Sequence, residues 1–99
     1  MIVVNGIVKS TREDIIALQG AISTMETASR AESGCQDYTF SVELNDPSTV
    51  RITERWDSIE DLKAHFATPH MAEFQQAMAD RSPASVEVKF YEVKEIQLL

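Results

Sequence analysis

Between Tyr38 and Trp56 the sequence reads YTFSVELNDPSTVRITERW, and the architecture can be worked out from this segment. Apolar side chains alternate with polar ones on either side of its middle: Tyr38, Phe40, Val42 and Leu44 come first, and Val50, Ile52 and Trp56 follow. A period of two is typical of a β-strand with one buried face. Residues 45–48 predict a turn, because Pro47 restricts the backbone. The segment therefore predicts a β-hairpin.

The region before the hairpin predicts a strand and then a helix. Residues 2–9 are rich in valine and isoleucine, which favour strands. Ser10 and Glu13 have the spacing of a capping box, so we expect a helix to begin there. Gly34 predicts its end, because glycine enters the left-handed region freely. Apolar residues recur between these points at helical spacing and predict one buried stripe: Ile15, Leu18, Ile22 and Met25.

The region after the hairpin predicts two short helices and a last strand. Ser58 and Asp61 are typical of a helix start. Thr68-Pro69 predicts a second start, because proline is favoured at the first helical position. Alternating valines predict a strand over residues 85–93.

The order β-α-β-β-α(α)-β predicts an α+β fold, the split βαβ sandwich of ferredoxin-like domains. We expect a single domain over residues 1–99, with its core at about 2–93. The helices would cover one face of the sheet, and we expect Tyr38 and Phe40 on the other face. A second copy covering that face would give a homodimer in the form of an α/β barrel.

Composition excludes several classes of partner. The net charge of -7 and the scattered basic residues argue against nucleic acid, whose phosphates bind clustered Lys and Arg. No segment approaches the roughly 20 apolar residues of a membrane span, so no membrane partner is expected. The first residues do not resemble a signal peptide, and Cys35 is the single cysteine. Both observations favour a cytoplasmic protein.

Glu54 and Trp56 are the first candidates for a functional site. A carboxylate among apolar strand residues is costly to bury without a partner or a task. Glu54 therefore either forms a structural ion pair, with Lys89, a histidine or the Arg55 of a second copy, or acts as a base with a raised pKa. Trp56 either fills the core or forms a wall on which a flat substrate stacks.

His65 and His70 are the second pair of candidates. His65 lies at the edge of the predicted helix stripe, where it could contact Glu54 and serve as an acid or base. His70 follows Pro69 near a helix N-terminus, where the helix dipole disfavours a cation. The two histidines are five residues apart across a helix break and lack an evident third ligand. We therefore expect no metal site.

Four separate motifs, taken together, resemble the antibiotic biosynthesis monooxygenase domain. They are Glu32-Ser33-Gly34-Cys35 with Tyr38, Asp46-Pro47, Glu54-Arg55-Trp56 with Ser58, and Ala64-His65 with Thr68-Pro69-His70-Met71. The resemblance runs from about residue 2 to residue 92. It implies a dimer of ferredoxin-like subunits with a pocket between each sheet and its helices.

The resemblance also implies roles for several residues. It places Trp56 in a substrate cavity, and Asn5 near a position that contacts substrate in some members. From the residues alone, Asn5 is either an irregularity of the first strand or a hydrogen-bonding group. We expect Phe66, Phe74 and Tyr38 to complete the wall of the pocket, although Tyr38 also suits the core.

These observations predict a monooxygenase that oxidises a quinol or polyphenolic aromatic with molecular oxygen and without a bound cofactor. His65, Glu54 or His70 would remove the phenolic proton, and Asn5 would stabilise the oxyanion. No glycine-rich dinucleotide fingerprint is present. The alternatives are a haem-degrading monooxygenase, a small-molecule isomerase and a non-enzymatic binding module of the same fold. The haem alternative needs an axial histidine in the last helix, where the resemblance places Phe74 or Gln75.

Overall fold

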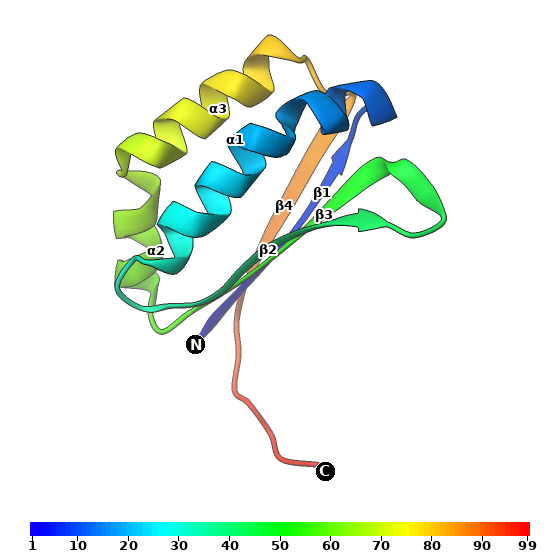
Figure 1. The fold of residues 1–99 in the computed structure, drawn as a ribbon. Coiled ribbons are helices and arrows are strands. Elements are labelled where there is room, and N and C mark those ends of the chain that lie inside the picture. Colours follow the sequence, from blue (N-terminus) through cyan, green and yellow to red (C-terminus); the bar gives the residue numbers. More distant parts are fainter.

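The computed structural model describes all residues from 1 to 99 and confirms the expected α+β fold (Figure 1). The elements follow one another as β1 (Ile2–Lys9), α1 (Arg12–Arg30), β2 (Cys35–Glu43), β3 (Asp46–Trp56), α2 (Ile59–Phe66), α3 (Pro69–Asp80) and β4 (Ser85–Glu92). The four strands form an antiparallel sheet in the order β2-β3-β1-β4. None of the helices combines the length and the apolar run that a bilayer crossing needs.

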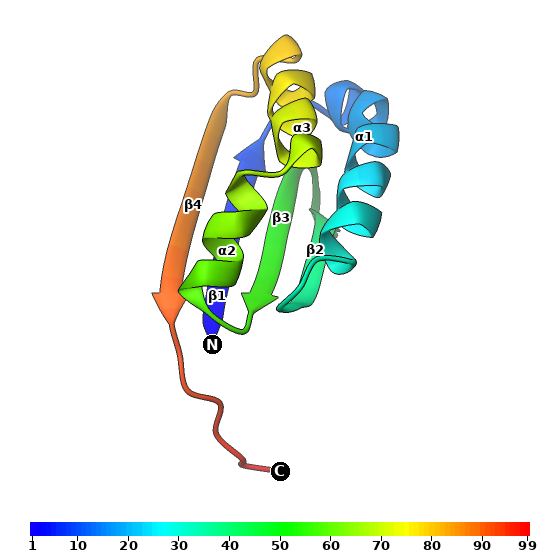
Figure 2. The same ribbon diagram turned by 90° about the vertical axis from the view of Figure 1, so that its left-hand side faces the viewer.

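All three helices lie on one side of the sheet, as the two views together show (Figures 1 and 2). Helix α1 packs on β2 and β3, and α3 lies beside α1. Edge strand β4 receives less cover, and its residues are exposed along its whole length. The other side of the sheet carries no element of this chain and is called the open face below.

Strand register decides which residues face the helices. Val4 pairs with Glu54 in β3 and with Phe90 in β4, and Glu54 pairs with Tyr38 in β2. These side chains form one row under the helices, where Tyr38 is 2% exposed and joins the main hydrophobic cluster. The expectation that Tyr38 and Phe40 face away from the helices is therefore wrong. Their bulk fills the space under α1 and α3.

The open face carries mostly polar residues. It carries the odd-numbered residues of β1, of β2 from Asp37 onward and of β3, including Asn5 and its cross-strand partner Thr53. It carries an ion pair between Arg55 of β3 and Asp37 of β2 at 3.5 Å and one within β4 between Lys89 and Glu87 at 3.1 Å. Tyr38 and Phe40, on which the dimer was predicted, are thus absent from this face, whose apolar side chains are Val3, Ile7 and Tyr91. The dimer stays a prediction.

Two observed element boundaries differ from the predicted ones by a few residues. Thr11, not Ser10, is the cap of α1, and its hydroxyl accepts the backbone N–H of Asp14 over 3.1 Å. The hairpin turn is Leu44–Asn45, and residues 46–48 already belong to β3. The Asp46 carboxylate holds them there by accepting from the hydroxyls of Ser48 and Thr49, each over 2.6 Å.

Gly34 does not end α1, which stops at Arg30. It has a φ of 81° in the loop that leads into β2. A Cβ atom at this position would collide with the Asp61 side chain of α2. Gly34 therefore lets this loop approach the start of α2, and the same loop carries Glu32 toward the helices.

Candidate functional site

A cavity of about 300 Å³ lies between the sheet and helices α2 and α3. Twelve of its fourteen lining residues are hydrophobic, and the remaining two are Glu54 and Gln75. Phe74 of α3 meets Phe40 edge to face, with ring centroids 5.3 Å apart, and Phe66 meets Phe90 in the same way at 6.1 Å. The cavity is an aromatic slot with one carboxyl group in its wall, a composition suited to a flat apolar ligand with a polar substituent.

Glu54 is the charged group of this cavity. It is 8% exposed, and its Oε1 accepts a hydrogen bond of 2.9 Å from Trp56 Nε1. Burial raises the pKa of Glu54, while the bond from Trp56 and the nearby His65 act in the opposite direction. A carboxyl group with a raised pKa can exchange protons nearer to neutral pH than an exposed one.

Of the partners predicted for Glu54, a histidine lies nearby, the Arg55 of a second copy stays a prediction, and Lys89 is engaged elsewhere. Lys89 pairs with Glu87 on the open face, and Arg55 with Asp37. Trp56 is fully buried behind the cavity wall and supports Glu54 through the indole N–H. The alternation of the strand predicted that Glu54 and Trp56 share a face. It did not predict their hydrogen bond, because side chains two residues apart on one face do not necessarily touch.

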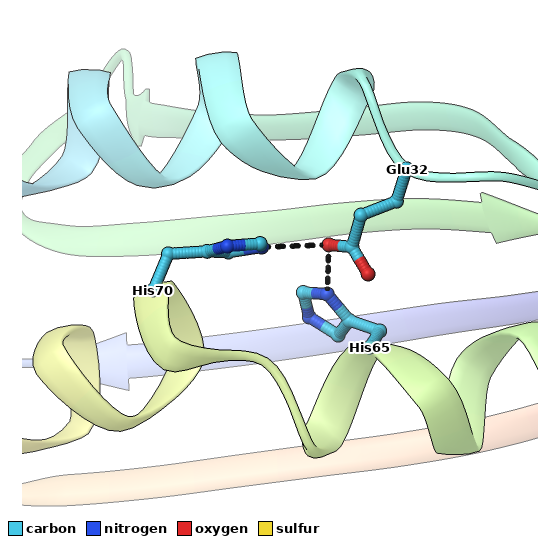
Figure 3. Close-up of side chains that lie close together, drawn as sticks. All are labelled: Glu32, His65 and His70. Atoms are coloured by element: carbon cyan, nitrogen blue, oxygen red, sulfur yellow. Dashed lines mark hydrogen bonds and ion pairs between the residues drawn. The ribbon is translucent and has the colours of Figure 1, made fainter.

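The two histidines meet on a residue that the sequence analysis did not assign. Glu32 Oε2 lies 2.7 Å from His65 Nδ1 and 2.8 Å from His70 Nε2 (Figure 3). The loop after α1 presents Glu32, the last turn of α2 presents His65, and the first turn of α3 presents His70. Glu32 opens one of the four family-like motifs, which was the available signal. Sequence spacing could not predict a contact between residues 33 and 38 positions apart.

The Glu32 contact assigns the protonation of His65. A carboxylate only accepts hydrogen bonds, so Nδ1 carries the proton and Nε2 of the neutral ring carries the lone pair. His65 is completely buried, and its Nε2 has no hydrogen-bond partner. Its ring lies against Trp56 at 4.8 Å and Tyr38 at 5.2 Å between centroids. Buried polar atoms are usually satisfied, so an unpaired acceptor next to a cavity wall calls for an explanation.

Glu32, His65 and His70 are also the residues that could hold a metal ion. Their ligating atoms lie within 4.8 Å of one another, so the expectation that the histidines lack a third ligand is wrong. Two histidines and a carboxylate suit transition metals. In the observed arrangement, however, both nitrogens point at one carboxylate oxygen, and an ion would have to replace both N–H protons. The absence of a metal cofactor stays a prediction.

The remaining predicted residues divide between the two faces. Tyr38, Phe66 and Phe74 line the cavity, and burial raises the pKa of the Tyr38 hydroxyl far above its usual range. Asn5 is exposed on the open face, because its register places it opposite Thr53 rather than Glu54. It cannot reach the cavity of its own subunit.

A second hollow, of about 280 Å³, lies between α1 and β2 but lacks a free reactive group. Its carboxylate, Glu26, accepts the backbone N–H of Phe40 over 2.8 Å and lies 3.6 Å from Arg30. The cavity beside Glu54 and His65 is therefore the stronger candidate site.

Comparison with known proteins identifies the family. The family model for antibiotic biosynthesis monooxygenase matches residues 1–77. The chain belongs to the antibiotic biosynthesis monooxygenase family. An uncharacterised protein of Synechocystis sp. is 33% identical over 101 residues, which span 99% of this chain and 67% of that protein.

Solved structures agree with this membership. A proposed antibiotic biosynthesis monooxygenase from Deinococcus radiodurans is 25% identical and superposes with a TM-score of 0.91 over 100% of this chain and 98% of its own. A second one, from Nitrosomonas europaea, is 20% identical, with a TM-score of 0.87 over 94% of this chain and 98% of its own. The family and the Deinococcus structure support a general monooxygenase-like function for the chain.

Proposed function

We propose that this antibiotic biosynthesis monooxygenase family member oxidises a quinol or polyphenolic aromatic with molecular oxygen and without a bound cofactor. The observation that carries the proposal is the apolar aromatic cavity with Glu54 in its wall. Such a cavity can orient a flat ring, whose binding would displace water from Glu54, and it offers one group for proton transfer.

The reaction begins when the Glu54 carboxylate takes the proton of a phenolic O–H bond. The O–H electron pair stays on the phenolate, which is electron-rich enough to reduce oxygen. For a naphthoquinol, one oxygen atom enters the product as a ring hydroxyl, and the other leaves as water. The quinol supplies all four electrons and becomes a hydroxyquinone, so the balance needs no further reductant.

The histidines favour this reaction over haem degradation. A haem iron needs an axial ligand from the protein. His70 is the histidine of α3, and its Nε2 is engaged by Glu32. Gln75 is the polar residue that α3 contributes to the cavity, and an amide is a poor substitute for an imidazole ligand.

We also propose that two copies associate through their open faces. The polar open face carries acidic and basic residues side by side, including Asp37, Arg55, Glu87 and Lys89. A twofold-symmetric contact can pair such charges across the interface. Light scattering at micromolar concentration would give the mass of a dimer, and a monomer mass would refute this part of the proposal.

The test of the reaction is oxygen uptake with menadiol in the presence of the protein. We expect uptake above the spontaneous rate and formation of a hydroxylated quinone. Glu54→Gln keeps the shape of the side chain but cannot accept the proton, so it should lower the rate by about 10²-fold or more. Glu73→Gln, an exposed position on α3, is the matched control. A wild-type rate equal to the spontaneous rate would refute the proposal.

A further inference from the structure

The cavity between the sheet and the helices has two polar residues in its apolar wall, one from each layer. Glu54 belongs to strand β3, and Gln75 belongs to helix α3, which lies over the sheet (Figure 1). We propose that Gln75 is a specificity-determining residue, whose amide binds the second oxygen of an aromatic diol while the first oxygen lies at Glu54. The inference rests on the proposed function and deepens it, because it narrows the substrate to rings that carry two oxygen atoms at opposite positions.

Gln75 interrupts the apolar face that α3 turns toward the cavity. Met71, Phe74 and Met78 line the cavity together with Gln75. Residues three and four positions apart share one face of a helix, and a face turned toward the interior is ordinarily apolar. A ligand that fills the cavity removes water from the amide, which then loses free energy unless the ligand supplies a hydrogen bond. The position of Gln75 therefore favours a ligand with a polar group at this end.

The neighbouring Gln76 shows how a glutamine on the outer side of α3 behaves. Its Nε2 donates a hydrogen bond of 2.9 Å to Oδ1 of Asp80, one turn further along the helix. It is exposed and does not belong to the cavity wall. The two glutamines thus have the same chemistry and differ in the side of the helix on which they lie, so Gln76 is a matched control for Gln75.

Glu54 and Gln75 lie at different depths of the cavity. Glu54 is 8% exposed and is bonded by the buried Trp56. Gln75 lines the same cavity and is exposed, which places it where the cavity opens to solvent. A flat ring with one oxygen at Glu54 therefore has its opposite edge toward the opening. A monophenol would engage Glu54 alone, whereas a diol can engage both residues.

An amide suits both oxidation states of the second oxygen. The Oε1 atom of a glutamine accepts a hydrogen bond from the hydroxyl of a quinol. Its Nε2 atom donates to the carbonyl oxygen that takes the place of this hydroxyl in a quinone. A carboxylate would only accept, and a leucine would do neither. Gln75 can thus hold the ring before and after the oxidation and takes no part in the proton transfer.

The test measures binding under nitrogen, so that it needs no turnover. Isothermal titration calorimetry compares naphthohydroquinone, which has two opposite hydroxyls, with alpha-naphthol, which has one. We expect the wild type to bind the diol about 3- to 10-fold more tightly, as one neutral hydrogen bond would give. Gln75→Leu continues the apolar face of α3 and should remove this preference. Gln76→Leu should keep it.

A Gln75→Leu variant that still prefers the diol would overturn the inference, and so would a wild type without the preference. Oxygen uptake with naphthohydroquinone in air separates these outcomes from a failure of the proposed function. Uptake by the wild type, with an unchanged preference in Gln75→Leu, overturns the role of Gln75 and leaves the oxidation intact. The expected preference without uptake supports the role of Gln75 in ligand recognition and refutes the oxidation.

Discussion

The indole Nε1 of Trp56 donates a 2.9 Å hydrogen bond to Oε1 of Glu54, and both residues are buried on the helix-facing side of β3. This bond is the direct interaction that stabilises the Glu54 carboxylate in an apolar cavity. It links a fully buried aromatic ring to the group that we propose as proton acceptor. Because the bond favours the ionised form, it limits how far burial raises the pKa of Glu54.

Replacing Trp56 with Phe should raise the pKa of Glu54 further, because the donor is lost while the burial remains. We expect the acid limb of the pH–rate profile to move to higher pH, and the free energy of unfolding to fall by about 1–3 kcal/mol. In a Glu54→Gln background the same change should leave the profile where it is. If the acid limb does not shift in Trp56→Phe, it reflects the titration of a group other than Glu54.

Glu54→Gln should change how stability depends on pH. Since burial raises the folded pKa of Glu54 above its ordinary value of 4.5, the wild type binds more protons folded than unfolded in this range. Its stability should therefore fall as pH rises from about 4.5 through the raised folded pKa. The glutamine side chain does not titrate, so the variant should gain thermal stability relative to wild type as pH rises from about 4 to about 8, as measured by calorimetry. A constant difference across this range would contradict the raised pKa.

His65→Ala should lower the stability of the protein. The side chain is completely buried and bonds Glu32, so its loss leaves a cavity and a carboxylate without one of its donors. We expect a loss of about 2–4 kcal/mol in the free energy of unfolding by urea titration. His70→Ala, at a partly exposed ring, is the matched control and should cost less. If the two variants lose the same free energy of unfolding, the burial of His65 contributes little to stability.

Gly34→Ala should destabilise the protein, because Gly34 has a φ of 81° and an added Cβ meets Asp61. The expected loss is about 1–3 kcal/mol in urea unfolding. Gly20→Ala is the matched control, since a Cβ there meets nothing within 4 Å on an exposed helical position. That control should gain about 0.5–1 kcal/mol. A neutral Gly34→Ala would show that this loop can move away from α2.

Cys35 should react slowly with thiol reagents near neutral pH. Burial, with Glu32 and Glu54 nearby, raises its pKa to about 11. Since only the thiolate is nucleophilic, the rate should climb as pH rises toward 11. The same chain in urea should react at the rate of an ordinary cysteine. Fast labelling of the folded protein at neutral pH would contradict a raised pKa.

Local sequence patterns predicted the order of the elements, the caps at Ser58 and Thr68, and the presence of Glu54 and Trp56 on one strand face. These features depend on neighbours a few residues apart, which alternation and helical spacing reveal. The four motifs also predicted the family, which the family model confirmed.

Alternation says which side chains share a face, but not which face the helices cover. Tyr38 was expected on the open face and lies under the helices, while Asn5 was expected at the cavity and lies on the open face. The partnership of Glu32 with His65 and His70 joins residues more than thirty positions apart. It exists because the loop after α1 and the junction of α2 and α3 pack over the same end of the sheet. Only that packing brings a carboxylate to both imidazoles and leaves one buried nitrogen of His65 unpaired.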